Sequence, residues 1–182
     1  MTENKISKLE NQLNYFYSKF KNDPKLKEFF RFIDYLSIKN IYKFNFLNGI
    51  TYEEIGNIKY EAKPAEFLHF SSQNKYDNII YQYFNLEYSD CDIRNKSFNR
   101  NNIIPFAFDE NGRDAFYISC YPESYGQILF HEGDCNWDLT FKSGTWIISK
   151  NFTEFIEKII SQNKDYKDIE FLQDAYMNIT KQ

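Results

Sequence analysis

Few residues in this sequence of 182 could support acid–base, nucleophilic or metal chemistry. Its only histidines are His69 and His131, which restricts the choice of a general base or a metal ligand. Residues 131–135 read His-Glu-Gly-Asp-Cys and gather potential ligands, but no paired cysteine or histidine spacing completes a zinc site. We therefore expect a strand end followed by an acidic turn, and we predict neither a metal nor a cofactor.

The other candidate motifs also favour structural interpretations. Cys135 lies near His131, but its acidic surroundings disfavour the thiolate that a nucleophile requires. Residues 109–114 resemble a calcium loop superficially, yet their glycine is misplaced for an EF-hand, and Gly112 suits a hairpin turn. Phosphate-cradling and nucleophile-elbow motifs are absent from the sequence. We predict that the chain is not an enzyme.

Composition limits the partners and the compartment. The formal net charge of -4 gives no support for binding a phosphate backbone, so we predict no nucleic-acid partner. Three cysteines in a chain of this length fit a reducing compartment, and we predict a cytoplasmic location. We see no leader peptide and no apolar run of the roughly 20 residues that span a bilayer, so we expect no membrane association. The sequence does not determine the oligomeric state.

Charge is distributed unevenly along the chain. The segment Lys5–Lys43 is basic overall, whereas Glu87–Asp138 is rich in Asp and Glu. The acidic segment could dock a basic partner, or it could be the solvated surface of an ordinary acidic protein. Charge asymmetry alone does not decide between these two interpretations.

Two apolar stripes at helical spacing open the chain. Residues 6–20 and 26–36 place large apolar side chains three and four positions apart, with polar residues between them. Asp23 and Pro24 would supply a capping side chain and a first-turn proline for the second helix. We predict that residues 1–40 form a helical hairpin that belongs to the same domain as the rest.

Strand patterns follow from about residue 41. Apolar and polar residues alternate over 42–46, and Asn48-Gly49 is a favoured hairpin-turn pair. The return strand would run through Ile50 and Tyr52, or an irregular loop would begin near Glu53. Residues 66–70 and 79–84 are further strand candidates.

The clearest strands lie between residues 103 and 148. Residues 103–108 and 114–121 flank a glycine-containing turn, and 127–131 and 146–148 give two more strands without crossover helices. Asn151 then caps a helix, and a further helix follows over 171–179. We predict a single α+β domain over 1–182, with helices on one face of a curved, mainly antiparallel sheet of about six strands.

Five short motifs between residues 103 and 156 occur in a distinctive order. They are Ile104-Pro105, Gly112 with Asp114, Phe116–Ser119, Tyr125-Gly126-Gln127-Ile128, and the Phe152–Ile156 helix start. Their order and spacing resemble the SUKH superfamily of cell-wall assembly regulators and toxin-immunity proteins, over about a third of the chain. Ile80–Glu87 is similar to the family strand that precedes a variable loop. The family's proline-led helix near the N-terminus has no clear counterpart, although 26–36 would occupy that place.

The resemblance implies an α+β binding domain, used in bacteria mainly as an intracellular antidote to a secreted toxin, often a nuclease or deaminase. Charge-complementary residues and aromatic anchors for such a toxin are expected at Asp109, Glu110, Asp114, Tyr121, Glu123, Tyr125, Glu132, Asp134 and Trp137. Each of these residues could instead keep a turn soluble or pack against the sheet. A regulatory or scaffold module with a cellular partner is the second hypothesis. A small enzyme or ligand binder, with a deep polar pocket in the sheet, is the third.

Overall fold

The computed structural model describes residues 3–70, 78–80, 83, 102–110, 112–133, 144–167 and 169–180. Its elements, in chain order, are α1 (Glu3–Phe20), α2 (Lys27–Lys39), β1 (Ile50–Ile55), β2 (Ile58–Ala62), β3 (Glu66–Phe67), β4 (Ile103–Phe108), β5 (Ala115–Ser119), the short 3-10 helix η2 (Pro122–Ser124), β6 (Ile128–His131), β7 (Thr145–Ser149), α4 (Phe152–Gln162) and α5 (Ile169–Thr180).

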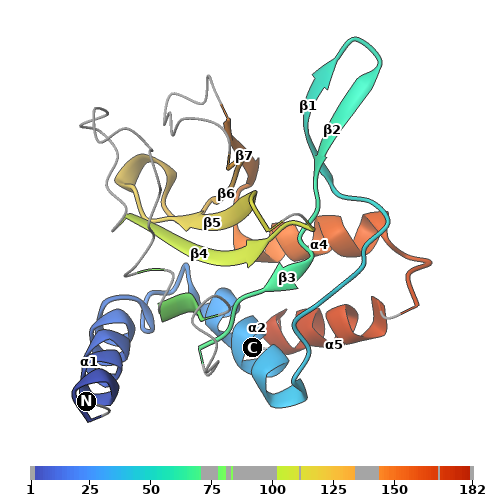
Figure 1. Ribbon diagram of the computed structural model, residues 1–182. Coiled ribbons are helices and arrows are strands. Elements are labelled where there is room, and N and C mark those ends of the chain that lie inside the picture. Colours follow the sequence, from blue (N-terminus) through green and yellow to red (C-terminus); the bar gives the residue numbers. More distant parts are fainter. Residues whose placement is uncertain are drawn as a thin grey trace.

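The larger sheet is a simple antiparallel meander. Its strands are hydrogen-bonded in the order β3-β4-β5-β6-β7, and β1 and β2 form a separate two-stranded sheet. Helices α2, α4 and α5 lie together on one side of the larger sheet, and the β1–β2 hairpin lies beside β7 and α4 and projects away from α2 and α5 (Figure 1). The predicted α+β class, antiparallel sheet and flanking helices are confirmed, with the strands divided between two sheets.

Aromatic side chains join the sheet to the helices. The Phe155 ring of α4 lies 5.5 Å from Phe106 and 5.8 Å from Phe116, measured between centroids. Phe152 lies 5.4 Å from Phe29 and 5.1 Å from Phe32, which brings α2 against the same core. These rings are almost fully buried, so their removal from water is a main source of stability.

A second apolar cluster lies on the other face of the larger sheet. It contains Ile103, Ala115, Tyr117, Tyr121 and Leu129. Because side chains alternate between faces, this cluster explains why every residue of β5 and nearly every residue of β4 is buried. These two strands are therefore apolar except for Ser119 at the end of β5.

The segment before β1 differs from its prediction. Residues 42–46 form no hairpin strand; the segment runs beside β3, where the Phe44 N–H donates to Ala65 and the Phe67 N–H donates to Tyr42. Phe44 and Phe46 are both buried, which accounts for the alternating pattern. Asn48-Gly49 is not a hairpin turn, because the Asn48 N–H donates to the side chain of Asn163. The hairpin forms one segment later, over residues 50–62.

Two other boundaries also differ. In the predicted strand 79–84, the described residues Ile79, Ile80 and Tyr83 are helical and buried, and the rest lies outside the described residues. Asp23 does not cap α2, which begins at Lys27. Its Oδ1 accepts the N–H of Lys25 at 2.9 Å and so closes a turn that precedes the helix.

The β1–β2 hairpin turns at Gly56-Asn57. Gly56 has a φ of 63°, which suits the first central position of a type II′ turn. An irregularity between Thr51 and Glu53 marks a bulge at Tyr52. The hairpin is held at its base, where the Tyr52 ring lies 4.9 Å from Phe130 and 4.6 Å from Trp146.

Candidate protein-binding surface

The turn between β4 and β5 is held together by its own carboxylates. Asp109 accepts the backbone N–H groups of Arg113 and Asp114, each at 3.2 Å, through Oδ1. Gly112 has a φ of 68°, which confirms its predicted place in the turn. Asp114 Oδ1 in turn accepts the N–H of Gly133 at 3.0 Å, which ties the turn to the end of β6.

Tyr52 brings the hairpin to this same place. Its hydroxyl donates to Glu132 Oε1 at 2.6 Å, directly after β6. Burial raises the pKa of Tyr52, and so do the hydrogen bond to Glu132 and the charges of Glu132, Asp114 and Glu53. The Tyr52 hydroxyl therefore contacts the carboxylate of Glu132 and lies in the field of the Asp114 and Glu53 carboxylates.

Glu110 lies beside this cluster and is more open to solvent. Its carboxylate is 2.7 Å from Lys63 Nζ, and its side chain is 55% exposed. An exposed ion pair of this kind contributes little to stability, so Glu110 is available to a partner at small cost. We call Glu53, Asp109, Glu110, Asp114 and Glu132 the acidic end of the sheet.

The structure does not unite all the predicted partner-binding residues. Tyr121, Glu123 and Tyr125 lie at the opposite end of β5 and β6, about 15 Å away at the usual rise along a strand. Tyr121 is buried, Glu123 is exposed, and the Tyr125 hydroxyl donates to Asp23 Oδ2 at 2.6 Å. Asp134 and Trp137 lie outside the described residues. The prediction therefore separates into two surfaces.

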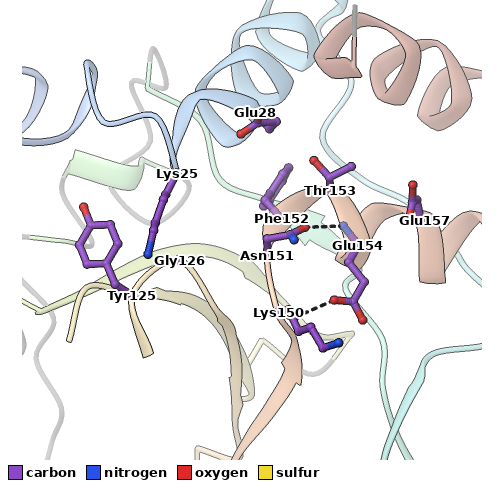
Figure 2. A pocket seen from close by; sticks show the side chains of 10 residues that line it. All are labelled: Lys25, Glu28, Tyr125, Gly126, Lys150, Asn151, Phe152, Thr153, Glu154 and Glu157. Atoms are coloured by element: carbon purple, nitrogen blue, oxygen red, sulfur yellow. Dashed lines mark hydrogen bonds between the residues drawn. The ribbon is translucent and has the colours of Figure 1, made fainter. Parts of the chain in front are cut away.

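An open cleft of about 500 Å³ lies at the second surface, between Tyr125 and the start of α4 (Figure 2). Its polar groups serve the helix start: Asn151 Oδ1 accepts the Glu154 N–H at 2.8 Å, and Glu154 Oε2 accepts the Lys150 N–H at 3.0 Å. The hydrogen bond from Lys158 is the main cause that lowers the pKa of Glu154. Lys25, Lys150, Glu28 and Glu157 also line the cleft, so its charge is mixed.

The described histidines, His69 and His131, and the described cysteine, Cys120, pack against neighbouring side chains of the fold. His131 is buried, and its Nδ1 lies 2.9 Å from Thr145 Oγ1. The His69 ring stacks on Tyr42, with centroids 3.7 Å apart. Burial raises the pKa of Cys120 to about 12, which keeps this thiol protonated. Cys91 and Cys135 lie outside the described residues.

The described residues contain neither a metal-binding cluster nor a membrane-spanning helix. No three of their His, Cys, Asp and Glu side chains gather as a metal site. None of their helices combines the length and apolar character needed to cross a bilayer.

Tyr52 is the residue that sequence reasoning missed at the acidic end. Its place in a strand was considered, but its contact lies 80 positions along the chain, at Glu132. No family model, curated protein or solved structure matches the chain. The acidic end is therefore identified as a candidate binding surface from the geometry of the structure.

Proposed function

We propose that this chain is a cytoplasmic immunity protein that binds and neutralises a cognate toxin of the nuclease or deaminase type. The proposal gives the chain no catalytic role. It begins from the resemblance to the SUKH superfamily over residues 103–156. The α+β class of the fold agrees with what that resemblance implies.

The observation that carries the proposal is the gathering of carboxylates around Tyr52. Enzymes that act on nucleic acids need a cationic site, and an acidic surface can cover such a site and speed the encounter. Asp109 and Asp114 also hold the β4–β5 turn, so their charges are presented on a fixed frame. Glu110, at the exposed rim, would make first contact with a basic partner.

The partner to test is the product of the neighbouring gene. We expect it to be toxic alone, and we expect this chain to rescue growth and to co-purify with it in low salt. High salt should weaken the complex, because screening acts on exposed charges. Absence of toxicity, rescue and binding would reject this pair and favour a regulatory or scaffold role.

The two ends of the sheet provide a matched pair of variants. Glu110→Lys and Glu123→Lys make the same charge change at exposed positions of opposite ends. We expect Glu110→Lys to slow association by about tenfold in low salt, and Glu123→Lys to change it little. Surface plasmon resonance measures both rates. A larger effect of Glu123→Lys would move the binding surface to the cleft end.

A further inference from the structure

Strand β2 is an outer edge of the structure. β1 lies toward the larger sheet, through the contacts of Tyr52 with Phe130 and Trp146, and β2 lies on its far side (Figure 1). Within the described residues, β1 is the only strand that pairs with the backbone of β2. Such an edge presents backbone N–H and C=O groups that another strand can pair with.

The turn geometry determines which backbone groups face outward. Ile55 and Ile58 flank the two-residue turn as a cross-strand pair, so the backbone groups of Ile58 point toward β1. Successive residues of a strand point their N–H and C=O groups to alternate sides. The outer edge of β2 is therefore formed by the backbone groups of Lys59 and Glu61.

The charged side chains along this edge are complementary to those of a second copy of β2. If a second β2 pairs antiparallel about a twofold axis at Tyr60, Lys59 of each copy lies opposite Glu61 of the other. Within one copy Glu61 Oε2 accepts the Gly49 N–H at 3.0 Å, so the second carboxylate oxygen of Glu61 would meet Lys59. Opposite charges at directly facing positions stabilise antiparallel pairs. Glu54 pairs with Lys59 within the hairpin, so the charges would alternate in sign across the joined sheet.

The other face of the hairpin carries exposed apolar side chains. The register places Ile55, Ile58 and Tyr60 on one face, where they are 57%, 60% and 38% exposed. The twofold axis would set the two Tyr60 rings side by side and join the two apolar stripes into one band. A two-stranded ribbon is marginally stable in water, whereas a wider sheet with an apolar face is more stable.

We propose that this chain forms a symmetric dimer through β2, in which two β1–β2 hairpins build one four-stranded antiparallel sheet. The occupant of the edge is a second copy of the chain, because antiparallel pairing of two β2 strands places Lys59 of each copy opposite Glu61 of the other. This is an isologous interface, which closes at two subunits. It does not depend on the proposed toxin.

Charge exchange between two variants gives the sharpest test. In Lys59→Glu, two glutamates would face two glutamates across the axis, and in Glu61→Lys, lysines would face lysines. We expect each variant alone to weaken self-association by at least about tenfold, and an equimolar mixture of the two to restore a dimer. Analytical ultracentrifugation over a range of concentrations measures all three samples beside the wild type.

A backbone variant tests the edge itself. Because the Lys59 N–H faces outward, Lys59→Pro removes a bond to the second copy and none to β1. We expect Lys59→Pro to be monomeric with an unchanged circular dichroism spectrum, and Lys59→Ala, which keeps the N–H, to remain a dimer. A wild type that stays monomeric at all concentrations would overturn the proposal. So would a dimer that neither the charge variants nor Lys59→Pro weakens.

Discussion

At the scale of single residues, Tyr52 combines two roles. Its ring holds the hairpin against Phe130 and Trp146, and its hydroxyl donates to Glu132. Tyr52→Phe keeps the ring and removes only the hydrogen bond. We expect this variant to lose about 1 kcal/mol of unfolding free energy at neutral pH, measured by urea denaturation. Tyr60→Phe, at an exposed position, is the control and should lose little.

The same substitution has a defined pH dependence. The pKa of Tyr52 is raised in the folded state above its ordinary value of 10.0, first by burial and then by Glu132. Its contribution is therefore complete below pH 10.0 and is lost as pH rises through the folded-state pKa. The difference in stability between wild type and Tyr52→Phe should shrink above pH 10.0. A constant difference would show that the hydroxyl is not coupled to folding.

The sequence predicted part of the acidic end because part of it is local. Asp109, Glu110 and Asp114 occur in a turn between two recognisable strands, and Glu132 follows the next strand. Consecutive antiparallel strands bring those ends together without further information. Tyr121 and Tyr125 are near them in sequence, although a strand length separates the two ends. Strand direction, which a list of residues ignores, explains why the predicted residues lie on two surfaces.

At the scale of elements, the two ends of α4 are fixed by asparagines. Asn151 caps the start, through its contact with the Glu154 N–H. Asn163 follows the last turn and is buried. Its Oδ1 accepts from the N–H groups of Leu47 and Asn48 at 2.9 and 3.0 Å, and its Nδ2 donates to the carbonyls of Asn48 and Ile159 at 2.8 and 2.9 Å. This side chain ties α4 to the segment before β1.

We expect the two asparagines to differ in importance. Asn151→Ala should cost about 1 kcal/mol, the usual value for a lost cap. Asn163→Ala should cost about 3 kcal/mol, because it removes all the hydrogen bonds that the buried amide makes with Leu47, Asn48 and Ile159. Chemical denaturation of both variants measures the difference. Equal losses would mean that water replaces the missing amide of Asn163.

The contrast also explains which elements could be predicted. The cap at Asn151 was predicted, since both partners lie three positions apart. The Leu47 and Asn48 partners of Asn163 lie more than a hundred positions away, and no local pattern signals them. Residues 42–46 alternate like a hairpin strand because they run alongside β3. Their partner segment, residues 65–67, lies beyond the β1–β2 hairpin in the sequence. Local periodicity predicted most of the element types, with 42–46 and 79–84 as exceptions, and distant partners decided the pairing.

At the scale of the whole molecule, one apolar core links the described elements. It includes residues of α1, α2, the larger sheet, α4 and α5, and the Phe106 ring packs against those of Phe29, Phe152 and Phe155. We expect a single cooperative unfolding transition, with circular dichroism and tryptophan fluorescence coinciding. Phe106→Ala should lower the unfolding free energy by about 3–5 kcal/mol without separating the two signals. Two separate transitions would contradict the single-domain prediction.

The tip of the β1–β2 hairpin offers a practical use. A Cβ built on Gly56 meets no atom within 4 Å, and the tip projects away from the core (Figure 1). Exposed loop tips are the positions where proteins best accept extra residues. An epitope or a fluorophore inserted between Gly56 and Asn57 would therefore label the molecule while leaving its interior packing intact, and would report on whatever approaches the hairpin.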